Sequence, residues 1–97
     1  MAGLIRSVQA EGGFATVVAK GERDAGTILV VCCEQGKNAV AYERMPQPDG
    51  SRTWTITRQE NAEDASDFWE YCRRRHDQDP DLWIVELDIA RAERFIA

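Results

Sequence analysis

Hydrophobic residues along the chain fall into segments whose spacing changes from helical to extended. Apolar residues within positions 4–8 are spaced for one face of a short helix, and two glycines at 12–13 follow it. Glycine readily takes the left-handed conformation that often ends a helix. The β-branched and apolar run at 14–19 then predicts a strand.

The middle of the chain predicts three further strands joined by tight turns. Residues 27–33 are apolar at consecutive positions, which indicates burial on both faces and a central place in a sheet. A glycine-containing turn is expected at 34–38, followed by a strand at 39–45. Two prolines and an Asp-Gly pair mark a turn at 46–50, and residues 52–57 alternate as a half-buried strand does.

The last third predicts a helix, a stop and a buried strand. Asn61 is expected to be the N-cap, and an apolar stripe at helical spacing runs over 65–72. Pro80 ends the helix, and residues 82–87 read as a strand with two apolar faces. Residues 88–97 fit either a helical turn or a turn ahead of a short edge strand at 95–96.

The order of these elements predicts an α+β fold in a single compact domain, residues 1–97. Short connections favour an antiparallel β-meander sheet of about five strands, packed against two helices in two layers. Because the strand at 82–87 returns after a helix, it is expected to insert beside a central strand.

Net charge disfavours two classes of partner. The chain has a formal charge of −5, with seven acidic and seven basic residues in 1–60 but ten acidic and five basic in 61–97. Such a chain lacks the positive footprint that binds phosphate backbones or anionic membranes. No signal peptide is visible, and the longest apolar run is far too short to span a bilayer. We expect a cytoplasmic protein without nucleic-acid or membrane partners.

Three cysteines also favour a reducing compartment. Their number is odd, and Cys32 and Cys33 are adjacent on a predicted strand, so their side chains point to opposite faces. They are therefore poorly placed to form a disulfide or to share a metal ion. Burial on a central strand and on the apolar helix stripe is the expected role of Cys32, Cys33 and Cys72.

Three blocks of the sequence carry a resemblance. They are residues 11–21 (Glu-Gly-Gly-Phe-Ala-Thr-Val-Val-Ala-Lys-Gly), 24–30 (Asp-Ala-Gly-Thr-Ile-Leu-Val) and 79–86 (Asp-Pro-Asp-Leu-Trp-Ile-Val-Glu), the last being the most specific. In this order and spacing the chain resembles a small bacterial family catalogued as domain of unknown function 1491. The resemblance implies a compact, cytosolic, stand-alone domain. It implies no activity and carries over no functional residues.

The densest group of chemically capable side chains lies between Arg73 and Asp81. Arg75, His76, Asp79 and Asp81 form the candidate site, since carboxylates bind Mg²⁺ or Ca²⁺ and guanidinium groups bind anions. A structural explanation competes with it. Cations suit the last turn of a helix, and aspartates accept backbone N–H bonds in turns.

Two more specific patterns, one for calcium binding and one for catalysis, are incomplete. An EF-hand loop counted from Asp77 would need glycine where Leu82 stands and glutamate where Asp88 stands. The only histidine, His76, has no serine in a Gly-x-Ser-x-Gly context to act with. Trp54, Trp69 and Trp83 are expected in the core, with Tyr71 at a surface.

We therefore interpret the chain as a small non-catalytic cytosolic domain that acts through protein contacts or through self-association. A sheet built of hairpins leaves edge strands, and pairing of edge strands between copies would give a homo-oligomer. No cofactor is expected. The alternative is a small enzyme or a metal- or anion-binding domain with its site around Arg73 to Asp81.

Overall fold

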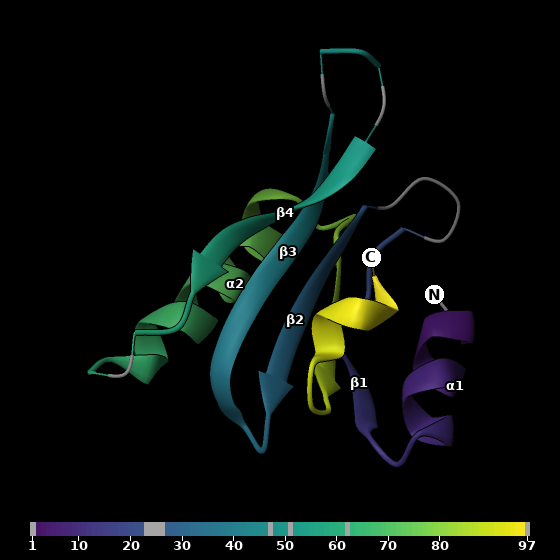
Figure 1. The fold of residues 1–97 in the computed structure, drawn as a ribbon. Helices are drawn as coiled ribbons and strands as arrows, with labels where there is room; N and C mark the ends of the chain where they lie inside the picture. The colour runs from purple at the N-terminus through teal and green to yellow at the C-terminus, as the bar shows by residue number, and fades with distance from the viewer. Residues whose placement is uncertain (1, 23–26, 47, 51, 62, 97) are drawn as a thin grey trace.

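The protein folds around one five-stranded sheet with helices on both faces (Figure 1). This computed structural model describes residues 2–22, 27–46, 48–50, 52–61 and 63–96. In chain order the elements are α1 (Ala2–Ala10), β1 (Phe14–Ala19), β2 (Ile28–Glu34), β3 (Lys37–Pro46), β4 (Arg52–Gln59), α2 (Ala65–Gln78), β5 (Trp83–Asp88) and the 3-10 helix η1 (Ala92–Phe95).

The sheet is mixed, with the strand order β1-β5-β2-β3-β4. Every neighbouring pair is antiparallel except β2 and β5, which run parallel. The five strands and two α-helices were predicted correctly, as was the insertion of the last strand, but the purely antiparallel meander was wrong. The reason is α2, which carries the chain back to the end of the sheet where β2 begins. There Trp83 N donates to the carbonyl of Thr27 at 2.8 Å.

The prediction of two layers was also wrong, because the sheet has a helical layer on each face. Consecutive residues of β2 enter different cores: Leu29 and Val31 pack with Phe68 of α2, whereas Val30 packs with Val8 of α1. A strand whose residues are buried on both faces needs cover on both faces. The consecutive apolar residues of β2 already indicated in the sequence that both faces of this strand are buried.

Glycine conformation and a carboxylate fix the chain reversals beside the sheet. Gly12 has φ +84°, as expected for the end of α1, and Gly13 N donates to the carbonyl of Val8 at 3.0 Å. In the β2–β3 hairpin both Gln35 and Gly36 have positive φ. The side chain of Asp88, at the end of β5, accepts hydrogen bonds from both turn amides, at 2.7 and 3.0 Å.

The start of α2 differs from the prediction. Asn61 does not cap the helix, because its Oδ1 accepts a hydrogen bond from Glu63 N at 2.9 Å in a local turn. Asp64 is the N-cap instead, and its carboxylate accepts from Ser66 Oγ at 2.7 Å. Asparagine competes for nearby backbone amides in just this way, so a capping residue and a turn residue look alike in sequence.

The tail of the chain takes the helical alternative, since Ala92–Phe95 form η1 and not an edge strand. Parts of the predicted connections at 20–26 and 46–50 lie outside the described residues.

Neither helical layer covers the whole sheet. On one face α2 packs over β2, β3 and β5, while Phe14 of β1 stays 73% exposed. On the other face α1 and η1 pack over β1, β5 and β2, while Ile56 of β4 stays 48% exposed. Two uncovered sheet surfaces therefore lie on opposite faces and at opposite edges.

Candidate functional site

The segment from Arg73 to Asp81 forms the end of α2 and the turn into β5. Asp79 is the C-cap of α2, and its amide donates to the carbonyl of Arg75 at 3.0 Å. Leu82 N donates to the carbonyl of Asp79 at 3.0 Å, which closes the turn across Pro80. The chain then enters β5 with Leu82 fully buried.

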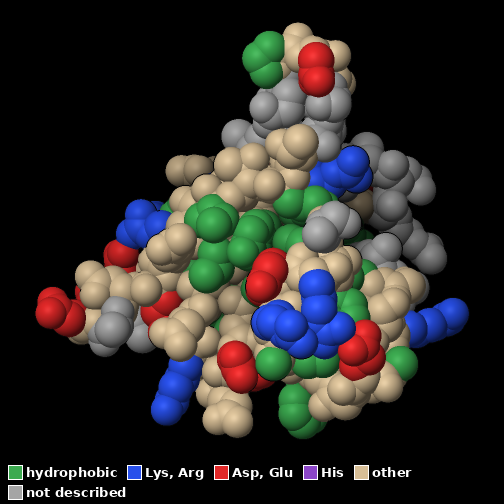
Figure 2. Space-filling view, in the orientation of Figure 1, with side chains coloured by type: hydrophobic (Ala, Val, Ile, Leu, Met, Phe, Trp, Pro, Cys, Tyr) green, Lys and Arg blue, Asp and Glu red, His purple; other side chains and the backbone are tan. Residues whose placement is uncertain are grey.

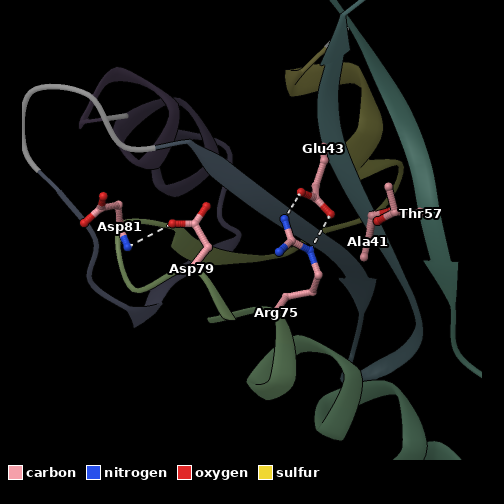
Figure 3. A network of polar contacts seen from close by, with 6 residues as sticks. All are labelled: Ala41, Glu43, Thr57, Arg75, Asp79 and Asp81. Atoms are coloured by element: carbon pink, nitrogen blue, oxygen red, sulfur yellow. Dashed lines mark hydrogen bonds and ion pairs between the residues drawn. The ribbon is translucent and has the colours of Figure 1, made fainter. Parts of the chain in front are cut away.

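Arg75 points away from that turn and across the sheet to Glu43 of β3 (Figure 3). Its Nη2 and Nε donate to the two carboxylate oxygens at 2.6 and 3.3 Å. The two side chains are only 26% and 12% exposed. The hydrogen bonds that Arg75 donates to Glu43 raise the pKa of Arg75 above its ordinary value. A bidentate pair of this kind anchors α2 to β3.

The other three candidate side chains have separate partners. His76 Nε2 lies 3.0 Å from the carbonyl oxygen of Lys20, which follows β1. Asp79 Oδ1 accepts from Asp81 N at 3.2 Å, and the Asp81 carboxylate points away from Arg75 (Figure 3). The structure therefore does not bring Arg75, His76, Asp79 and Asp81 onto one shared point. It shows the aspartate turn that the structural explanation anticipated.

Arg73 and Arg74 are exposed and make no ion pair with any described residue. Among the residues that the structure describes, no three His, Cys, Asp or Glu side chains are grouped closely enough to hold a metal ion.

The three thiols are buried and resist ionisation. Cys32 faces the α1 side of the sheet and Cys33 the α2 side, as predicted. Burial, with Glu93 nearby, raises the pKa of Cys32 to about 12, and burial with Glu86 and Asp88 nearby does the same for Cys33. Burial raises the pKa of Cys72 to about 11. Since the thiolate is the reactive form, all three thiols are poor nucleophiles near neutral pH.

The aromatic residues only partly match their predicted places. Trp54, Trp69 and Trp83 are all half-buried, and Trp54 and Trp69 pack at the margins of the two cores and not inside them. Trp83 Nε1 donates to the carbonyl of Glu22 at 2.8 Å. Tyr71 is also half-buried, with the Arg58 guanidinium 5.2 Å from its ring centroid.

Two shallow hollows lie at the same end of the sheet, away from the Arg73–Asp81 segment. One, of about 130 Å³, lies between the β2–β3 hairpin and η1, where Val40 and Tyr42 form part of its wall. The other, of about 330 Å³, lies between the α1–β1 turn and that hairpin and is lined by Phe14 and Asp88 among others.

Sequence reasoning missed the exposed apolar side chains. Phe14, Val17 and Val18 of β1 are 73%, 36% and 46% exposed, and Ile56 of β4 is 48% exposed. For β1 a signal was available, because residues 14–19 carry no charge and no proline. Such a strand is either central or an unprotected edge, and only the topology tells which.

The fold defines a class: a small α+β domain in which α1 and η1 cover one face of a mixed sheet and α2 covers the other. The chain matches, over residues 1–97, the family described as protein of unknown function (DUF1491). It belongs to that family, as the three sequence blocks suggested.

Solved structures of relatives share this fold. A crystal structure of a DUF1491 family protein from Caulobacter crescentus CB15 superimposes with a TM-score of 0.83 at 32% identity, covering 99% of this chain and 89% of that one. An NMR structure of a DUF1491 family protein from the same organism gives 0.80 at 32% identity, covering 99% and 86%. Protein Atu0922 from A. tumefaciens gives 0.72 at 28% identity, covering 98% and 86%.

No curated protein matches the sequence. None of the helices in the described part of the chain has the length and apolar character needed to cross a membrane.

Proposed function

We propose that this protein is a non-catalytic interaction domain that self-associates by antiparallel pairing of β1 with β1 of a second copy. One observation carries the proposal. β1 is an edge strand without a charged residue or a proline, and Phe14, Val17 and Val18 are exposed on it.

Edge strands normally carry features that prevent pairing with other chains. The opposite edge strand, β4, has them: Arg58 is held by an ion pair to Asp67, and the register shifts near Ile56. β1 has a register shift beyond Val17 but no charge along its length. The free backbone groups of β1 are therefore the better template for another strand.

Charge distribution favours a second copy in the antiparallel orientation. Two chains of charge −5 repel each other over most of their surface, so contact is cheapest where charge is absent. Lys20 follows β1, while Glu11 precedes it and Asp88 lies opposite Phe14 in the register. Antiparallel pairing brings Lys20 of each copy toward the acidic end of the other strand.

The rest of the molecule is in keeping with a binding role. Arg75, His76 and Asp79 of the charged segment are engaged within the fold, and the cysteines are buried free thiols. The proposal places the domain in a reducing cytoplasm, where free thiols persist.

Light scattering coupled to size-exclusion chromatography, over a concentration series, tests the pairing. The wild-type mass should rise from one chain to two with concentration. Val17→Lys should weaken the dimer about tenfold or more, because it puts a charge on the pairing edge. The matched control is Thr55→Lys, which puts the same charge on the exposed part of β4 and should leave the dimer unchanged.

A wild-type protein that keeps a one-chain mass up to millimolar concentration would overturn the proposal. So would equal weakening by Val17→Lys and Thr55→Lys, since that result would indicate a general charge effect.

A further inference from the structure

We propose that the uncovered surface of β3 and β4 is a docking site for an amphipathic helix of a partner protein, with an acidic residue beside the apolar stripe of that helix. We call this surface the open β3–β4 face. It consists of Val40, Tyr42 and Arg44 of β3 with Trp54 and Ile56 of β4.

The strand register puts these side chains on one face. Tyr42 lies directly opposite Ile56, and Arg44 lies opposite Trp54. Opposed residues of antiparallel strands share a face, and alternate residues of one strand do so too. Because Tyr42 and Trp54 pack at the margin of the core that contains Val8 of α1, this is the face covered elsewhere by α1 and η1.

The described helices leave the β4 side of this face exposed. α1 packs against β1 and η1, whereas η1 packs against β2 and borders β3, where Val40 and Tyr42 share the 130 Å³ hollow with residues of η1. Figure 2 shows hydrophobic side chains gathered over β3 and β4, with a group of charged side chains beside them over η1. Ile56 is 48% exposed, and Tyr42 and Trp54 are half-buried.

The same two strands show what kind of element fits. On the opposite face, Ala39 and Ala41 of β3 are buried under Phe68 and Cys72 of α2. Two strands span about 10 Å, which is the diameter of a helix with its side chains. A partner helix on the open β3–β4 face would complete the layer that η1 begins. Tryptophan, tyrosine and arginine are also the residue types that contribute most to protein interfaces.

The charge of the open β3–β4 face indicates which kind of helix would bind there. Arg44 is exposed, lies 6.0 Å from the ring centroid of Trp54 and makes no ion pair with a described residue. At the other end of the face, Lys37 and Arg91 around the 130 Å³ hollow are balanced by Glu34 and Glu93. Among the described residues of this face, the uncompensated charge is therefore positive and lies beside Trp54, where a carboxylate of the partner would be favourable.

Two synthetic peptides of about 18 residues test this inference, a length at which an isolated helix is marginal and can form on binding. Both carry leucines at helical spacing, one with flanking glutamates and the other with flanking lysines. Amide resonances of the protein are followed by NMR during titration, and peptide helicity by circular dichroism. We expect the glutamate peptide to gain helicity and to shift the resonances of Tyr42, Trp54 and Ile56.

Variants locate the contact. Ile56→Lys should weaken binding of the glutamate peptide about tenfold, and Arg44→Glu should reverse the preference toward the lysine peptide. Val17→Lys is the matched control at the opposite edge of the sheet and should leave peptide binding unchanged. Ile56→Lys should in turn leave the β1 dimer intact, so the two proposals fail independently.

Several results would overturn the inference. They are no shift of these resonances at millimolar glutamate peptide, equal binding of both peptides, binding insensitive to Ile56→Lys, or binding without gain of helicity. If the wild type binds neither peptide and Ile56→Lys loses self-association, the face would instead be assigned to a second copy of the chain.

Discussion

The segment from Arg73 to Asp81 and strand β1 differ in how fully the fold uses them. The segment has the most reactive side chains in the sequence, yet Arg75 is held by Glu43, His76 by a backbone carbonyl, and Asp79 by the amide of Asp81. β1 has no ionisable side chain, yet no described strand pairs with its outer edge, and Phe14, Val17 and Val18 are exposed on it. Chemical capability in a sequence is therefore a poor guide to where a surface is available for binding.

The physical reason is that a polar group near the core is stabilised only when it is paired, whereas an exposed apolar group can remain unpaired at modest cost. Polar side chains beside a helix end consequently tend to be paired with other groups of the same chain. Exposed apolar side chains on an edge strand have no such need for a partner within the fold, and they stay available to another protein.

The largest expected effect concerns the charged segment. Arg75→Ala removes the cation that pairs with the Glu43 carboxylate, whose side chain is 12% exposed in the wild type, so the free energy of unfolding should fall by about 3 kcal/mol. Arg73→Ala is the control, because it removes the same single charge from an exposed arginine that makes no ion pair with a described residue, and it should change stability by less than about 0.5 kcal/mol. Urea denaturation followed by circular dichroism measures both. Equal effects would mean that the pair with Glu43 contributes nothing specific.

The next effect concerns the contact between the end of β1 and the charged segment. A Cβ on Gly21 would overlap the carbonyl oxygen of Asp81, which is backbone and cannot rotate away. Gly21→Ala should therefore destabilise the protein by about 2 kcal/mol. Gly3→Ala is the control, because a Cβ there meets nothing within 4 Å and alanine suits a helix better than glycine. Thermal unfolding of the two variants should shift in opposite directions, and a shift in the same direction would contradict the expected overlap.

A smaller effect separates the two aspartates of the segment. Asp79→Ala removes the acceptor for Asp81 N and should cost about 1 kcal/mol. Asp81→Ala removes an exposed carboxylate that points away from Arg75 and should cost less than about 0.5 kcal/mol. Chemical denaturation measures the difference, and isothermal titration with Mg²⁺ on the wild type supplies an independent reading. Heat from metal binding that disappears in both variants would return the segment to the status of a binding site.

Much of the fold could be predicted from the sequence because the periodicities are local. Hydrophobic spacing located all five strands and both helices, and glycine chemistry located the end of α1 and the β2–β3 hairpin. The register and neighbours of β5 are not local, since they depend on which face α2 crosses. The apolar run of β2 indicated cover on both faces, and it should have excluded a two-layer arrangement.

The candidate site was less accessible to sequence reasoning for a related reason. Glu43 lies 32 positions before Arg75, and nothing in either local pattern links them. Exposure of Phe14 and Ile56 likewise depends on where each helical layer stops. Pairing and exposure are properties of the assembled layers, so a single sequence reveals the side chains but not whether the fold uses them.

The smallest expected effect concerns the exposed strand itself. Because Phe14 is 73% exposed, Phe14→Thr removes little buried surface and keeps a residue that suits a strand. In a sample dilute enough to be monomeric, the free energy of unfolding should change by less than about 0.5 kcal/mol. The same variant should weaken self-association in a concentrated sample, as measured by analytical ultracentrifugation. A large loss of monomer stability would show that the fold does use Phe14, and the contrast between β1 and the charged segment would then disappear.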